Sequence, residues 1–150
     1  MKFSHVLLPT DLSDESRRAY QVAADLARGS GAKLTLLSVV EDLKVAPHGA
    51  PFAPPIGDPD APAEAKALLE KLHAERGHLA DDVDVHCETV IGDPIGNAIA
   101  WYAHEHGCDV IVMSTQGHSG LKRLFLGSTA EEVLRHAEVP VMCIPPAAAK

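Results

Sequence analysis

The segment from Ser114 to Thr129, STQGHSGLKRLFLGST, contains the residues best suited to bind a small anion. Gly117 and Gly120 can form a turn whose N–H groups point inward, because glycine lets the main chain approach a phosphate closely. A helix is predicted to start at Gly127, and the first N–H groups of a helix attract anions. The spacing matches neither the P-loop nor the dinucleotide-binding fingerprint. The segment is therefore either a phosphate cradle of another kind or a long turn that its glycines shape.

Two single residues could add chemistry to such a site. Asp11 follows an apolar run and could accept hydrogen bonds from ribose hydroxyls or help to hold a metal, or form a local turn with Thr10 and Ser13. His118 could contact phosphate or carry a proton, and it could equally be a solvent-exposed loop residue. The sequence contains no H-E-x-x-H, no zinc-type spacing and no G-x-S-x-G elbow. We therefore predict binding rather than fast catalysis, with no catalytic residue and no protein metal site.

Hydrophobic patterning predicts strands and helices in strict alternation. Apolar runs typical of strands covered on both faces occur at 3–9, 33–40, 109–114 and 139–145. Residues 83–90 alternate apolar with polar, as a strand with one exposed face does. Helical spacing separates the strands, and residues 41–62 form a proline-rich irregular loop.

Residues with capping preferences predict where the helices begin and end. The first helix is expected to start at Ser13 and to close at Gly29. Asp93 is expected to cap the third helix and Pro94 to open it. A capping box and an inner face are predicted for the fourth helix from Ser128, Glu131, Val133, Leu134 and Ala137.

This order of elements predicts a single α/β domain over residues 1–150, with an open five-stranded parallel sheet and helices on both faces. Ligands of such sheets bind at the carboxyl ends of the strands, where the strand order reverses. If the first and fourth strands are neighbours at that point, residues 9–13 and 114–129 converge there. The predicted topology and the glycines therefore indicate the same segment, residues 114–129.

The composition of the chain limits the classes of partner that the protein is expected to bind. A net charge of −8 argues against non-specific nucleic-acid binding, which requires Lys and Arg to neutralise phosphates, and 4% aromatic residues leave little stacking surface. No apolar run approaches the ~18 residues that cross a bilayer, and no secretory signal is recognisable. Cys87, Cys108 and Cys143 form no C-x-x-C pair and are expected to be reduced, buried thiols. We expect a cytoplasmic protein that binds neither nucleic acid nor membrane.

Several motifs together resemble the universal stress protein family over essentially the whole chain. They are VLLPTDLSDES at 6–16, LLSVVED at 36–42, GDP at 92–94 and the last third from 110 to 144. The nucleotide-binding branch of that family carries G-x2-G-x9-G-[ST]. Gly117, Gly127 and Ser128 match this pattern. Ser114 departs from it, because it places a Cβ and a hydroxyl where the first glycine is expected.

The resemblance implies a fold, a ligand and a set of contacts. The fold is the adenine nucleotide alpha hydrolase-like sheet with strand order 3-2-1-4-5, and the ligand is ATP, AMP or ADP, with or without Mg²⁺. Adenine is implied near Pro9, Thr10 and Val39, and ribose near Asp11 and Met113. The implied phosphate contacts are Ser114, Gly117, His118, Ser119, Gly127, Ser128 and Thr129, and the spacing of the glycines adds Gly120.

The resemblance also implies a homodimer joined through the last strand, residues 140–144, which would cover an exposed sheet edge. The function predicted is an adenine-nucleotide-binding regulatory protein of the stress response, acting as a dimeric sensor or adaptor with an unknown regulatory partner. Two alternatives stay open. One is a protein-interaction module that needs no nucleotide, and the other is a slow Mg²⁺-dependent ATPase on the same fold.

Overall fold

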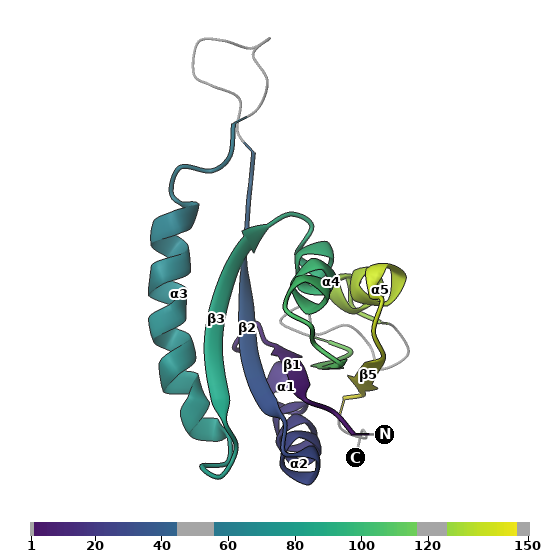
Figure 1. Ribbon diagram of the computed structural model, residues 1–150. Coiled ribbons are helices and arrows are strands. Elements are labelled where there is room, and N and C mark those ends of the chain that lie inside the picture. The colour runs from purple at the N-terminus through teal and green to yellow at the C-terminus, as the bar shows by residue number, and fades with distance from the viewer. Residues whose placement is uncertain (1, 45–55, 117–125, 147–150) are drawn as a thin grey trace, which may run out of the picture.

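The computed structural model describes residues 2–44, 56–116 and 126–146. Its strands are all parallel and follow the order β3-β2-β1-β4-β5, which confirms the predicted order 3-2-1-4-5 (Figure 1). The strands are β1 (His5–Pro9), β2 (Lys33–Glu41), β3 (Val85–Gly92), β4 (Val110–Ser114) and β5 (Val141–Ile144). The third strand starts later than predicted, because the Val83 N–H bonds to Ala80 O in a turn and not in the ladder.

Helices cover both faces of the sheet, as predicted. α1 (Asp14–Arg17), α2 (Tyr20–Ser30) and α3 (Ala61–Glu75) cover one face, and α4 (Ile95–Glu105) and α5 (Ser128–His136) cover the other (Figure 1). Val6 and Leu8 of β1 belong to the first core cluster and Leu7 to the second, since successive strand residues point to opposite faces. Both layers of helices therefore depend on the same central strand.

The first helical segment is divided by hydrogen bonds of its own side chains. Ser13 caps it as predicted, since its hydroxyl accepts from the Ser16 N–H at 3.1 Å. The Ser16 hydroxyl donates to Ser13 O at 2.8 Å and competes with the helical bonding of the main chain. The N–H groups of Arg18 and Ala19 bond three residues back, and the segment becomes α1 and α2.

Several predicted helix ends are wrong by one or two residues. Gly29 lies inside α2, and Gly31 closes it with a φ of 67°, which glycine adopts without strain. Asp93 does not cap α4, because Pro94 is still extended and Ile95 is the first helical residue.

The fourth predicted helix also differs in its start and in its inner face. Gly127 occupies the cap position of α5 in an extended conformation, so Ser128 is already helical and forms no capping box. Leu134 is 44% exposed, because the buried stripe of α5 runs through Ala130 and Val133. Gly107, with a φ of 62°, follows the end of α4.

Part of the predicted loop at 41–62 lies outside the described residues, namely 45–55. At its two ends, Glu41 completes β2, while Ala61 and Pro62 form the first turn of α3. A proline is tolerated there because the first N–H groups of a helix have no partner within it.

The close crossing of α4 and α5 gives a test of the fold. A Cβ added at Gly96 would lie 2.3 Å from the Glu132 Cβ and 2.9 Å from Thr129 O, whereas one added at Gly29 meets nothing within 4 Å. Both glycines are helical, so alanine adds the same helix propensity at each. We expect Gly96→Ala to be less stable to chemical unfolding than Gly29→Ala by about 1–3 kcal/mol. Equal stability of the two variants would contradict this crossing.

Candidate functional site

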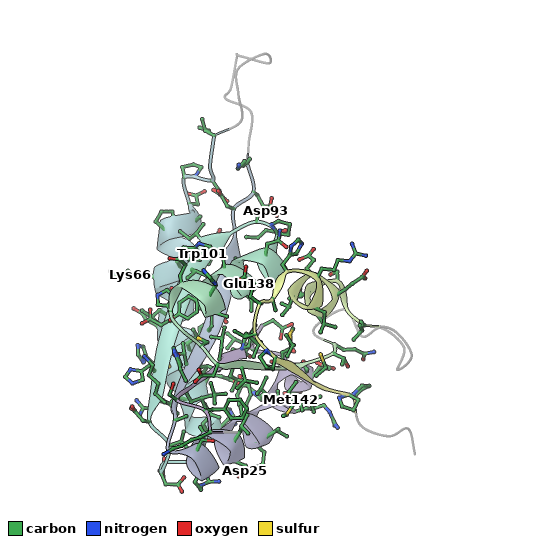
Figure 2. All side chains as sticks on the ribbon, turned by 45° about the vertical axis from the view of Figure 1, so that its right-hand side comes forward. Asp25, Lys66, Asp93, Trp101, Glu138 and Met142 are labelled. Carbon is green, nitrogen blue, oxygen red and sulfur yellow. The ribbon has the colours of Figure 1, made fainter. Side chains whose placement is uncertain are left out.

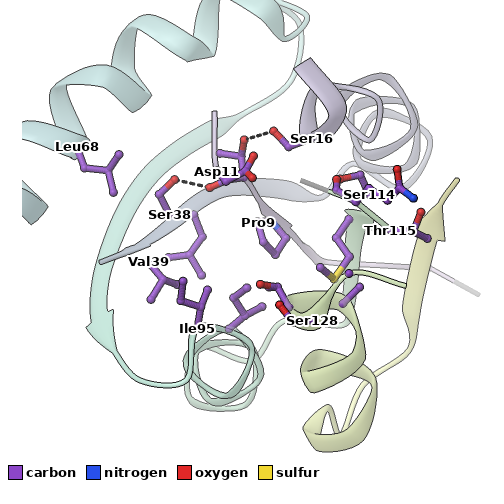
Figure 3. A pocket seen from close by; sticks show the side chains of 18 residues that line it. Pro9, Asp11, Ser16, Ser38, Val39, Leu68, Ile95, Ser114, Thr115 and Ser128 are labelled. Carbon is purple, nitrogen blue, oxygen red and sulfur yellow. Dashed lines mark hydrogen bonds between the residues drawn. The ribbon is translucent and has the colours of Figure 1, made fainter. Parts of the chain in front are cut away.

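A cavity of about 410 Å³ opens where β1, β2 and β4 end, at the point where the chain reverses its direction across the sheet (Figure 3). The predicted site residues that line it are Pro9, Thr10, Asp11, Val39, Met113, Ser114, Gly127, Ser128 and Thr129. Gly117, His118, Ser119 and Gly120 lie outside the described residues. The structure thus brings two segments about 100 residues apart into one cavity, as the topology requires.

Other lining residues were not predicted from the sequence. They are Ser16, Leu37, Ser38, Leu68, Ile95, Ile99, Thr115, Gln116 and Ala130. Ser38 and Thr115 adjoin predicted site residues on strand ends, so proximity along the chain could have found them. Leu68 and Ile95 come from helices, where the sequence marks them only as members of an apolar face.

The cavity has an apolar side and a polar side. Val39 of β2, Leu68 of α3 and Ile95 of α4 lie on the apolar side (Figure 3). Leu37 of β2 and Ile99 of α4 add apolar surface to the lining. The polar side carries the hydroxyls of Thr10, Ser114, Ser128 and Thr129. Such a division suits a ligand with a flat apolar part and a polar or anionic part.

The turn from Thr10 to Ser13 forms one rim of the cavity in a conformation that is unusual for its residues. Leu12 has a φ of 65°, in the left-handed region that leucine rarely adopts. The Thr10 Oγ1 accepts from the Leu12 N–H at 3.1 Å, and the Asp11 carboxylate accepts from the Ser13 N–H at 3.0 Å. Asp11 therefore makes the local turn that was one alternative, and it is exposed at the cavity.

A buried polar network supports this rim from below. The Thr10 hydroxyl lies 2.8 Å from the Ser16 hydroxyl and 2.8 Å from the Tyr20 hydroxyl. Tyr20 donates to the Glu75 carboxylate at 3.0 Å, and Arg17 binds both oxygens of Glu75 at 2.6 and 3.0 Å. Hydrogen bonds from Arg17 lower the pKa of Glu75, while burial raises the pKa of Tyr20. At neutral pH the carboxylate is ionised and the phenol keeps its proton.

The two ends of segment 114–129 are joined at the cavity. The Ser114 hydroxyl donates to Gln116 O at 2.6 Å, and the Gly127 N–H donates to Thr115 O at 2.8 Å. A Cβ at Gly127 would lie 3.1 Å from that Thr115 oxygen. The Ser114 hydroxyl thus bonds within its own turn, and α5 begins beside it with the N–H groups that a helix leaves without internal partners.

The described residues also bear on the expectations for metal ligands, membrane spans and cysteines. Among the described residues, no three His, Cys, Asp or Glu side chains are arranged to hold a metal ion. No helix within those ranges is long and apolar enough to cross a membrane. The three cysteines are free thiols, but Cys108 alone among them is buried and the other two are half-buried, which corrects the expectation of three buried thiols.

A doubly wound parallel sheet with a cavity at its switch point defines a class of ligand-binding α/β domains. The sequence model described as "Universal stress protein family" matches residues 2–145. The chain belongs to the universal stress protein family.

Relatives and solved structures agree with this family. The chain is 31% identical to universal stress protein MJ0531 of Methanocaldococcus jannaschii, over 95% of this chain and 82% of the relative. The structure of universal stress protein UspA from Lactobacillus plantarum is similar with a TM-score of 0.72 and 26% identity, over 96% of this chain and 99% of that one. A universal stress protein in complex with cAMP is similar with a TM-score of 0.66 and 25% identity, over 98% and 100%.

The buried Glu75 makes stability depend on pH. Its pKa is lowered in the folded protein from the usual 4.5, so its stabilising contribution is present above about 4.5 and is lost as pH falls through the lower folded value. We expect Glu75→Gln to unfold at a lower denaturant concentration than the native chain at pH 7. This difference in midpoint concentration should shrink below pH ~4.

The matched control is Asp82→Asn, which also removes a carboxylate that binds an arginine, Arg28, through two hydrogen bonds. Asp82 is exposed, so solvent screens that pair and a smaller difference is expected. A Glu75→Gln difference that stays constant from pH 7 to 3 would contradict the ionised carboxylate.

Proposed function

We propose that the protein binds an adenine nucleotide in this cavity and acts as a regulatory sensor or adaptor of the stress response. The observation that carries the proposal is the arrangement of the cavity: an apolar slot on one side and the start of α5 on the other. A nucleotide has the same division, with an apolar base at one end and phosphate at the other.

The apolar side fits a purine. Val39, Leu68 and Ile95 offer carbon surfaces from three different elements, so a flat ring would contact side chains on opposing walls. The cavity volume of about 410 Å³ lies within the range of small-ligand pockets, roughly 300–1,000 Å³. Its walls belong to packed strands and helices, which favours a site formed before the ligand arrives.

The polar side fits ribose and phosphate. Asp11 is the charged group among the described lining residues, and its carboxylate oxygens suit hydroxyl donors of a sugar. Gly127 presents its main chain without a Cβ beside the first turn of α5, where the helix dipole favours a phosphate group. Ser114, Ser128 and Thr129 complete this end, and Gly117 to Gly120 are proposed to continue it.

Relatives support the choice of ligand class. A similar universal stress protein is solved in complex with cAMP, an adenine nucleotide. We propose that ATP, AMP or ADP occupies the cavity here, with Mg²⁺ held by the phosphates and not by a protein site. A sensor role is favoured over catalysis, because Asp11 is the titratable side chain among the described lining residues and its carboxylate already accepts two hydrogen bonds within its own turn.

Binding supplies the first test. We expect saturable binding of AMP or ATP, measured by calorimetry at up to millimolar ligand with Mg²⁺. Gly127→Val should raise the Kd tenfold or more, because its branched side chain would crowd Thr115 O and cover the helix start. The control is Gly77→Val, at a glycine where an added Cβ meets nothing within 4 Å.

Other results would favour the alternatives. No saturable binding would favour a nucleotide-independent interaction module, which the serine at 114 also favours modestly. Single-turnover ATP hydrolysis that requires Mg²⁺ and is lost in Asp11→Ala, with ATP binding retained, would favour the slow ATPase. Unchanged affinity in Gly127→Val would place the ligand elsewhere.

We also propose a cytoplasmic homodimer joined through residues 140–144. β5 is an edge strand, so one row of its main-chain groups has no neighbouring strand within the described sheet. Met142 on this strand is 39% exposed (Figure 2). A second copy of the chain, paired with β5, would cover both these main-chain groups and the Met142 side chain.

The dimer proposal predicts the effect of a charge on β5. Met142→Lys should raise the dimer Kd tenfold or more, measured by sedimentation equilibrium, because it places a charge in an apolar interface. The control is Ile91→Lys, since Ile91 is 43% exposed on β3 at the opposite edge of the sheet. Dissociation by Ile91→Lys, with Met142→Lys still dimeric, would place the interface on the other edge.

A further inference from the structure

Glu75 lies outside the cavity but is connected to its rim through a chain of buried groups. It is the last residue of α3 and is 7% exposed. Tyr20, 3% exposed, bonds to Glu75 on one side and to Thr10 on the other. Thr10 in turn lines the cavity and bonds to the Leu12 N–H. The end of β1, α2 and the distant α3 thus meet under one turn.

The charge of Glu75 fixes the direction of the hydrogen bond that Tyr20 makes to it. A carboxylate held by Arg17 can only accept, so the Tyr20 O–H donates to it at 3.0 Å. The Tyr20 oxygen is then left to accept. The Thr10 hydroxyl, which also lies 2.8 Å from the Ser16 hydroxyl, can donate to it at 2.8 Å. With its proton turned toward Tyr20 or Ser16, the Thr10 oxygen presents lone pairs to the Leu12 N–H at 3.1 Å.

The last bond of this chain holds an unfavourable main-chain conformation. Leu12, with its φ of 65°, would relax to a more common conformation if nothing opposed it. Its neighbour Asp11 is oriented by the same turn, since Ser13 N–H and Oγ both donate to the Asp11 carboxylate. Loss of the Thr10–Leu12 bond would therefore change where Asp11 points.

We propose that Glu75 is a positioning residue for the nucleotide site, which acts through Tyr20 and Thr10 to hold the turn from Thr10 to Ser13 so that Asp11 meets the ribose hydroxyls. This inference rests on the proposed function. It assigns a role in sugar recognition to a residue of α3 that touches no part of the cavity.

The chain supplies matched controls for a purely structural role. Arg28 binds Asp82 at 2.7 and 3.0 Å, much as Arg17 binds Glu75, but neither residue lines the cavity. Tyr102 is 4% exposed in the opposite core, and burial raises its pKa to about 12, so it too is a buried neutral phenol. Asp82→Asn and Tyr102→Phe therefore remove the same groups from sites without a connection to the turn.

The test compares two ligands that differ only in the sugar. Kd values for AMP and for 2′,3′-dideoxyadenosine monophosphate are measured with Glu75→Gln, Tyr20→Phe and both controls, at a temperature where all four remain folded. In Glu75→Gln and Tyr20→Phe, AMP affinity should fall roughly five- to tenfold, the size of one or two hydrogen bonds, while dideoxy affinity changes less than about twofold. The controls should change neither. If Glu75→Gln does not fold, Tyr20→Phe, which keeps the buried ring, carries the test.

Hydrogen exchange gives a readout without ligand. The Leu12 and Ser13 amides should exchange faster in Glu75→Gln and Tyr20→Phe and at the native rate in both controls, since the bonds that protect these amides depend on the network. Equal loss of affinity for both ligands, or native exchange at Leu12, would overturn the inference while the proposed function stands. A native chain that binds neither ligand would overturn the proposed function, and the positioning role with it.

Discussion

The pairing of β1 with β2 on one side and β4 on the other is the constraint on which the rest of the molecule depends. Because all connections are parallel crossovers, the chain covers one face on its way to β2 and β3 and the other face on its way to β4 and β5. The segments that leave β1 and β4 therefore diverge, and side chains do not fill the space between them. The position of the cavity therefore follows from the strand order and not from any particular side chain.

Local hydrogen bonds hold the rims of the cavity that the strand order leaves open. On the β1 side, Thr10 and Asp11 fix a turn around Leu12. On the β4 side, hydrogen bonds of Ser114 and Gly127 hold the residues just after β4 beside the start of α5. Where the structure describes them, both rims consist of main chain held by local hydrogen bonds. Small residues predominate there because the main chain itself must lie close to whatever occupies the cavity.

The sequence predicted the parallel sheet and its alternation well, since strands covered on both faces are apolar throughout and β1 is buried along its whole length. It predicted the rim residues through their position at strand ends. It failed for Gly29, Asp93 and Ser128, where capping preference is weaker than the geometry imposed by neighbouring elements. It could not indicate Leu68 or Glu75. Glu75 bonds to Tyr20 of α2, and Leu68 lines the same cavity as the end of β1, so both relations join residues more than fifty positions apart and leave no periodic signal.

The contact of Gly96 with α5 has a consequence for the dimensions of the cavity. Gly96 follows Ile95, which lies on the apolar wall, and it approaches Thr129, which lies at the polar end. The Gly96 N–H also donates a hydrogen bond to the Glu132 carboxylate, at 3.0 Å. The distance between the two ends of the cavity is therefore set where two helices touch. A relative that accommodates a longer or shorter ligand would have to change this helix crossing, and substitution of the residues that line the cavity would not be sufficient.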